Sequence, residues 1–344
     1  MTLPFSQKPA KQLGMRASLI SSWTVAVLVL AFSPGVCPWS ASASEKKTPV
    51  ILDTDIGDDI DDTWALGLLL KSPDLDLKLV VTDYGKVNYR PRLVAKFLEG
   101  AGRTDVAVGV GLDAGAQGDG GQAQWIKGYN LQAYPGKVYS DGVQVLIDFV
   151  LKSDQLVTLI AIGPAPNIGE ALRREPRIAE KARFVGMYGS VRIGYGGART
   201  PAAEWNVRAD PRACRQIFTA RWDMLITPLD TCGLIVLKGD RYAQVRNSQD
   251  PIAKMVIENY RTWVASRNKG DASGADKESS TLFDCVAIYL ACSQEFCQVE
   301  KLGLRVTDDG FTRIDDSAKA VSAATAWKDQ DAFEDFLVRR LTSP

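Results

Sequence analysis

Six aspartates crowd into the ten residues from Asp53 to Asp62, near the start of the chain. The short apolar run from Val50 to Leu52 precedes them and is typical of a buried strand, and an apolar helical pattern follows them. Asp61 lies where that helix should begin, and the helix dipole stabilises carboxylates there. Carboxylates this close repel one another unless a cation lies between them, and oxygen-only ligands favour calcium or magnesium. The stretch therefore predicts a site for a hard cation.

Three other interpretations of this stretch fit less well. An EF-hand loop counted from Asp53 needs an oxygen ligand, Gly and Glu at its fifth, sixth and twelfth positions, where this sequence has Gly57, Asp58 and Trp64. An aspartate-nucleophile phosphatase also begins with a strand and Asp-x-Asp, but is expected to have Thr or Val in place of Gly57. A solvated acidic turn fits a lone Asp pair better than six carboxylates directly after a buried strand.

The start of the chain predicts a secretory signal peptide. A basic segment ending at Arg16 precedes an apolar stretch over residues 17–32, and Ala41-Ser42-Ala43 supplies an Ala-x-Ala cleavage site. The apolar stretch is short for a membrane span and is interrupted by Ser and Thr. We therefore expect residues 1–43 to be removed and residues 44–344 to be periplasmic or secreted, without a stable membrane span.

Composition excludes several classes of function. The sequence carries 41 basic and 41 acidic residues, so no nucleic-acid partner is expected. It has no histidine, which excludes histidine-dependent triads and argues against zinc. The cysteines after the signal peptide are odd in number and lack metal-ligand spacing, which argues against a disulfide framework, although a pair between Cys292 and Cys297 stays open. Homo-oligomerisation stays open as well.

Strand and helix patterns alternate along residues 44–344 and predict a single α/β domain. Continuous apolar strands interleaved with amphipathic helices favour a mostly parallel sheet with helices on both faces. In such sheets ligands bind beyond the carboxyl ends of the strands, where the aspartate stretch lies. The expected strands are 50–52, 77–82, 106–110, 156–162, 184–187 and 224–227, with a hairpin over 304–314, and the expected helices are 91–99, 142–151, 211–218 and 329–341.

Four segments in order resemble one family. Asp53-x-Asp55 with Asp61-Asp62 at a helix start resembles the calcium-dependent, inosine-uridine-preferring nucleoside hydrolases, whose run is Asp-x-Asp-Pro-Gly-x-Asp-Asp. In this chain Ile56 replaces the Pro, and two extra residues follow Gly57. The resemblance spans most of the chain because it returns at three later segments, residues 161–167 (AIGPAPN), 200–206 (TPAAEWN) and 279–284 (SSTLFD).

The resemblance implies calcium-dependent hydrolysis of the N-glycosidic bond of ribonucleosides, or of a related small-molecule riboside. By this resemblance the metal would be held by Asp55, Asp62, the main-chain carbonyl of Ile162 and Asp284. Asp55 would also be the general base for a metal-bound water that attacks C1′.

The resemblance also implies a set of sugar-binding residues. Asp61 would contact the ribose 2′-hydroxyl, Glu204 and Asn206 would hold the other ribose hydroxyls, and Trp205 would line the substrate site. Another interpretation stays open, in which Glu204, Asn206 and Asp284 merely cap helices. Asp53 is a candidate buttress for Asp55 rather than a ligand.

Three further positions depart from the family pattern. Lys86 and Ala198 stand where the family has Asn residues, and Phe283 replaces a histidine that can protonate a departing purine. A secreted calcium-containing protein that binds a sugar or nucleoside without turnover therefore stays open as the alternative function. Asp58 and Asp59 have no family counterpart and are expected to be solvated.

Two polar loops, residues 114–122 and 268–280, are either plain surface loops or lids over the site. If they are lids, Trp125 or Tyr129 would offer a stacking face for a base.

Overall fold

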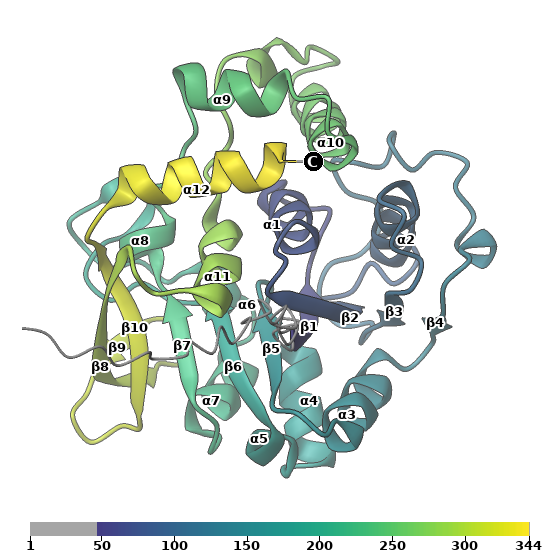
Figure 1. Cartoon of the computed structure of the whole chain (residues 1–344). Helices are drawn as coiled ribbons and strands as arrows, with labels where there is room; N and C mark the ends of the chain where they lie inside the picture. Colours follow the sequence, from purple (N-terminus) through teal and green to yellow (C-terminus); the bar gives the residue numbers. More distant parts are fainter. Residues whose placement is uncertain (1–46, 344) are drawn as a thin grey trace, which may run out of the picture. The chain divides into compact units, whose positions relative to one another are not determined.

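The computed structural model describes residues 47–343, so the predicted signal peptide lies outside the described residues. Ten strands form one sheet in the order β4-β3-β2-β1-β5-β6-β7-β10-β8-β9 (Figure 1). The strands β1 to β7 and β10 are parallel, whereas β8 and β9 are antiparallel. The strands are β1 (Thr48–Thr54), β2 (Leu75–Thr82), β3 (Ala107–Val110), β4 (Val138–Tyr139), β5 (Val157–Ala161), β6 (Ala182–Met187), β7 (Met224–Thr227), β8 (Cys297–Val306), β9 (Thr312–Ile314) and β10 (Ala320–Trp327).

Helices cover both faces of the sheet, as expected for a parallel α/β fold. One apolar core joins the sheet to α1, α2 and α8 to α12, and the second joins it to α3, α4, α5 and α7. No helix within residues 47–343 is long and apolar enough to cross a membrane. The α-helices are α1 (Asp61–Leu70), α2 (Arg90–Gly100), α3 (Gly142–Lys152), α4 (Pro166–Arg174), α5 (Ile178–Lys181), α6 (Trp205–Ala209), α7 (Pro211–Thr219), α8 (Leu229–Cys232), α9 (Gly239–Arg246), α10 (Pro251–Arg267), α11 (Phe283–Cys292) and α12 (Gln330–Thr342), and the 3-10 helices are η1 (Leu131–Ala133), η2 (Tyr195–Gly197) and η3 (Ser273–Asp276).

The order of the strands places a crevice at the end of β1. The chain moves outward from β1 to β2 and β3 in one direction, and from β5 to β6 and β7 in the other. Loops that leave β1 and β5 therefore diverge to opposite sides, and a ligand crevice opens between them. Asp53 pairs with Ala161 at this point, so the aspartate stretch after β1 lies beside the segment that follows β5.

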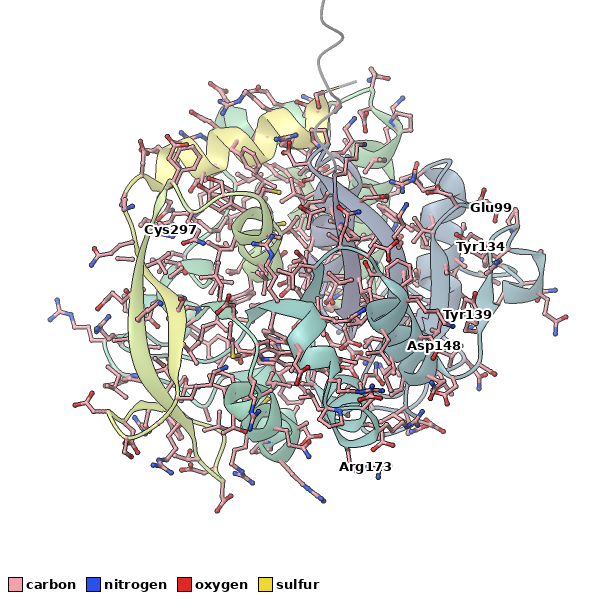
Figure 2. The ribbon with its side chains drawn as sticks, turned by 60° about the horizontal axis from the view of Figure 1, so that its bottom comes forward. Glu99, Tyr134, Tyr139, Asp148, Arg173 and Cys297 are labelled. Atoms are coloured by element: carbon pink, nitrogen blue, oxygen red, sulfur yellow. The ribbon has the colours of Figure 1, made fainter. Side chains whose placement is uncertain are left out.

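The predicted strands and helices are confirmed, and the predicted hairpin is the antiparallel pair of β8 and β9. Strand β10, which pairs with β7 and β8, was not predicted, because four of its eight residues are alanine, a residue type that is depleted in strands. Cys292 and Cys297 do not form the open pair, since both are free thiols. Figure 2 shows Cys297 at the β8 side and Tyr139 of β4 at the opposite edge.

Candidate active site

A cavity of about 190 Å³ opens at the carboxyl ends of β1, β5 and β6. The N-termini of α1, α6 and α11 also face it. It is smaller than the roughly 300–1,000 Å³ of a drug-sized ligand site, so it suits a sugar-sized group. It is lined by Asp55, Asp58, Asp59, Asp61, Asp62, Ile162, Met187, Tyr195, Glu204, Trp205, Asn206, Phe283 and Asp284. Every residue that the resemblance assigned to the metal or to the ribose site therefore lines this one cavity.

The turn after β1 depends on Gly57. Its φ angle is +111°, in the left-handed region that favours glycine, and a side chain there would collide with the ring of Tyr89. A second close approach lies across the crevice, where a Cβ on Gly163 would come within 2.8 Å of Asp55 Oδ1. Gly163 therefore lets the loops that carry Asp55 and Ile162 approach each other, whereas Gly57 lets the first of these loops pack against Tyr89.

Asp61, Asp62 and Asp284 form a group with metal-ligand spacing. Each offers a carboxylate oxygen, and the three oxygens lie within 4.8 Å of one another. Asp284 is the second residue of α11 and makes no capping hydrogen bond, so the interpretation of Asp284 as a mere cap is wrong. Asp55 lines the same cavity but lies outside this group of three.

The electrostatics of these carboxylates suit a cation. Burial, with repulsion from neighbouring aspartates, raises the pKa of Asp55 to about 6 and that of Asp61 to about 7. The same causes raise the pKa of Asp62 and of Asp284 well above the ordinary range. A bound cation would favour the ionised forms, and an all-oxygen ligand set suits calcium or magnesium. The residues present therefore fit a hard divalent metal.

Glu204 both caps a helix and lines the cavity. It is the N-cap of α6, and its Oε1 accepts a hydrogen bond from the Asn206 amide at 2.7 Å. Its Oε2 accepts from the Gly189 amide at 2.9 Å. Burial raises the pKa of Glu204 to about 7. The capping interpretation is correct for Glu204, but it does not remove the carboxylate from the cavity wall.

Asn206 bridges two strand ends instead of capping. Its Nδ2 donates to the carbonyl of Ile162 at 3.1 Å and to that of Met187 at 3.0 Å. This bond orients the Ile162 carbonyl, which keeps a second lone pair for a ligand. The neighbouring Trp205 is 43% exposed and lies at the rim, edge-on to Tyr84.

The aromatic wall of the cavity comes from Phe283 and Tyr195, whose ring centroids lie 6.1 Å apart. The Tyr195 hydroxyl accepts a hydrogen bond from the Trp205 amide at 2.8 Å, and burial raises the pKa of Tyr195. The expectation that Trp125 or Tyr129 would stack on a base is wrong. Trp125 packs on Phe97 of α2, and Tyr129 donates to Glu99, which Figure 2 shows on the β4 side of the sheet.

Neither predicted lid lines the cavity. In the loop 114–122, the Ala116 carbonyl accepts from the Lys86 amide at 2.9 Å. The loop 268–280 is held by Tyr242 and Tyr260, which donate to the carbonyls of Ala275 and Glu278. Both loops are therefore fixed to the body of the fold by hydrogen bonds.

Sequence reasoning missed the polar layer beneath the cavity. Asp53 is fully buried, its Oδ2 accepts from Asn167 at 2.9 Å, and it does not line the cavity, which favours the buttress interpretation. Asp83 follows β2 beside it, and Asp53 Oδ1 and Asp83 Oδ2 have no partner among the described residues. A carboxylate directly after β2 was the signal that could have identified Asp83.

Comparisons with known proteins agree on one family. The family model described as inosine-uridine preferring nucleoside hydrolase matches residues 50–335. A pyrimidine-specific ribonucleoside hydrolase, RihA, of Enterobacter sp. (strain 638) is 32% identical over 222 residues, covering 61% of this chain and 69% of that protein. A probable uridine nucleosidase 2 of Oryza sativa subsp. japonica is 26% identical over 296 residues, covering 81% and 85%.

Solved structures share the fold. A plant nucleoside hydrolase has a TM-score of 0.73 at 22% identity, covering 87% of this chain and all of that one. A purine-preferring ribonucleoside hydrolase from Gardnerella vaginalis has a TM-score of 0.68 at 22% identity, covering 86% and 98%.

Proposed function

Because the chain belongs to the family of inosine-uridine preferring nucleoside hydrolases, we propose that it uses calcium and the general base Asp55 to hydrolyse ribonucleosides. The observation that carries this proposal is the convergence of four buried carboxylates, Asp55, Asp61, Asp62 and Asp284, on one sugar-sized cavity. Relatives that are themselves ribonucleoside hydrolases support turnover over mere binding.

The ligand set proposed for calcium is Asp55, Asp62, Asp284 and the carbonyl of Ile162. When bound there, the cation would lower the pKa of a nearby water and interact with the ribose hydroxyls. Asp61 and Asp62 lie at the N-terminus of α1, whose dipole stabilises their negative charge. Thr54 donates to Asp62 at 2.5 Å and fixes its orientation.

The protein's own groups then divide the reaction between them. Asp55 accepts a proton from the attacking water, whose oxygen forms a bond to C1′. The C1′–N bond breaks and its electron pair leaves with the base. Asp61, Glu204 and Asn206 hold the ribose hydroxyls, and the surrounding carboxylates stabilise the positive charge that develops on the sugar. Trp205 covers the rim of the cavity.

Help for the leaving group is the missing part of this site. Phe283 occupies the position of the family histidine, and Lys86 forms an ion pair with Asp58. Tyr195 is the one phenol that lines the cavity, and its pKa is raised. The proposed enzyme therefore favours ribosides whose leaving group departs without a proton.

The first test is hydrolysis of a panel of ribonucleosides, with calcium and after chelation. Release of free ribose from at least one substrate, lost on chelation and restored by calcium, is the expected result. Restoration by magnesium alone would contradict the choice of calcium, and no turnover of any riboside would contradict the function.

Export is the other part of the proposal, motivated by the Ala41-Ser42-Ala43 motif. Intact-mass analysis of the protein from its native host should show a chain that begins at Ser44. A mass that retains the residues before Ser44 would contradict it.

A further inference from the structure

A fully buried arginine lies directly behind the loop that carries Asp55. Arg90, the first residue of α2, is 0% exposed. Its guanidinium donates to the Asp55 carbonyl, the Ile56 carbonyl at 3.0 Å, Asp58 Oδ2 at 2.8 Å, the Tyr84 carbonyl at 3.2 Å and the Gly85 carbonyl at 3.3 Å. The planar fork of arginine suits such a set of acceptors, whereas a lysine has only three donors on one nitrogen. Arg90 therefore joins the loop after β1 to the loop after β2.

Asp58 completes this arrangement, so the expectation that it is solvated is wrong. Its Oδ2 accepts from Arg90, its Oδ1 accepts from Lys86, and its side chain is only 35% exposed. Lys86, which stands where the family has an Asn, is thus directed to the inserted aspartate. Lys86 and the inserted Asp58, two of the departures from the family pattern, are therefore partners in one ion-pair cluster.

The main chain of Asp58 is held from a third element. Its carbonyl accepts from Trp263 Nε1 at 2.8 Å and from Arg267 at 3.0 Å, both on α10. The inserted residue is therefore fixed from α2, from α10 and from the loop after β2. An insertion beside a catalytic loop would otherwise add freedom to that loop.

We propose that Arg90, Asp58 and Lys86 form an ionic clamp in which Arg90 is a positioning residue for Asp55. The proposal rests on the function proposed above, in which the Asp55 carboxylate is both base and ligand. Arg90 binds the carbonyls of Asp55 and Ile56, so the clamp fixes the main chain from which the carboxylate projects. Asp58 and Lys86 fix the guanidinium in turn.

The size of the expected effect follows from geometry. Displacement of a reacting group by about 1 Å lowers a rate by about 10²-fold, and loss of a group that orients a metal ligand weakens metal binding by about 10–100-fold. Glu204 and Asn206, the proposed ribose ligands, are held by hydrogen bonds on the β5 and β6 side of the cavity, and none of these bonds involves Arg90. Loss of the clamp should thus lower kcat and calcium affinity far more than it raises KM.

The test uses Arg90→Lys, which keeps the charge but loses the fork, and Asp58→Asn, which places an amide N–H group against a cation. Arg92→Lys is the matched control, because Arg92 lies on the same helix and bonds the Asn88 carbonyl and Asp119 instead. Four quantities are measured for each variant: the calcium Kd by calorimetry, kcat and KM at saturating calcium, and Tm.

For Arg90→Lys we expect kcat to fall about 10²-fold and the calcium Kd to rise at least about tenfold, with KM within about threefold of the unsubstituted protein. For Asp58→Asn we expect kcat to fall about tenfold, and Arg92→Lys should leave all four quantities unchanged.

A folded Arg90→Lys protein with unchanged kcat and calcium Kd overturns the clamp. If this variant does not fold, Asp58→Asn decides on the same two quantities, and unchanged values again overturn it. An unsubstituted protein that binds calcium but cleaves no riboside would remove the proposed function alone, because weaker calcium binding in the variants would still support the clamp.

Discussion

Two sets of aspartates, a few residues apart in one loop and helix start, meet opposite electrostatic conditions. Asp58 contacts Lys86 and Arg90, and although burial alone would raise its pKa, these cations lower it. Asp61 and Asp62 form no salt bridge within residues 47–343, and burial with repulsion from neighbouring aspartates raises their pKa. The carboxylate of Asp58 is thus matched, in that it pairs with basic side chains of the protein. The carboxylates of Asp61 and Asp62 are unmatched, in that no basic side chain in the described part of the chain pairs with them.

This difference separates structural from functional carboxylates better than the sequence does. A matched carboxylate adds stability and needs no ligand, whereas an unmatched buried carboxylate destabilises the fold unless an external cation or a proton compensates it. Asp58 therefore belongs to the construction of the loop. Asp55, Asp61, Asp62 and Asp284 are left for a cation and a substrate.

The largest expected effect comes from Asp55. Asp55→Asn should lower kcat by at least about 10²-fold, because it removes the general base and damages the ligand set. Asp76→Asn is the control, since Asp76 lies near the start of β2, at the end of the strand opposite the cavity. The measurement is steady-state hydrolysis with Tm as a check of folding. A loss equal to that of the control would remove Asp55 from its role.

The second prediction concerns whether an unmatched carboxyl in the cavity donates a proton to the departing base. With calcium bound these groups should be ionised, so a purine would depart without help. We expect kcat for 4-nitrophenyl riboside to exceed kcat for inosine by more than about 10², the lower end of what a positioned acid contributes. Comparable rates would mean that a cavity group donates a proton, and the comparison between matched and unmatched aspartates would need revision.

Local sequence patterns predicted the strand ends and the helix start that carry the site residues. The strand before Asp53, the helix start at Asp61 and the strand end at Ile162 follow from apolar periodicity, and parallel strands bring their carboxyl ends together. The partners of Asp58 could not be predicted in this way. Lys86 and Arg90 approach it only because β1 and β2 are neighbours, and a single sequence does not show which charges meet. The prediction that Trp125 stacks on a base was wrong for the same reason, since the packing of Trp125 on Phe97 depends on tertiary contacts.

The third prediction concerns pH and the metal together. A carboxyl with a raised pKa in the folded state adds stability below its ordinary pKa, near 4, and this stability is lost as pH rises through the folded value. The folded pKa values of about 6 for Asp55 and about 7 for Asp61 place the loss between about pH 4 and 7. In the presence of a chelator, Tm should therefore decrease as the pH is raised from 5 to 8.

Calcium supplies the matching control for the pH series. At about 100 times its Kd, a ligand of the native state adds about 2.7 kcal/mol, which should raise Tm by several degrees at pH 8. The gain should shrink toward pH 5, where protons compete for the carboxylates. A Tm that is independent of both pH and calcium would contradict the account of these groups as unmatched ligands.

The smallest effect separates the two inserted aspartates. Asp58→Asn should lower the free energy of unfolding by about 1–2 kcal/mol, since it removes charged hydrogen bonds that are partly screened by solvent. Asp59 has a side chain that is 71% exposed and a single contact with Arg267 at 3.3 Å, so Asp59→Asn should change stability by less than about 0.5 kcal/mol. Urea unfolding of both variants at pH 7 measures the difference.

The pKa of Asp58 is lowered in the folded state, so its contribution to stability is present above the ordinary carboxyl pKa and is lost as pH falls below it. The difference in the free energy of unfolding between the unsubstituted protein and Asp58→Asn should thus disappear in acid. This pH dependence is opposite to that of the unmatched carboxyls, whose stabilising contribution is greatest in acid. Equal losses for Asp58→Asn and Asp59→Asn would show that solvent, rather than Lys86 and Arg90, balances the charge of Asp58.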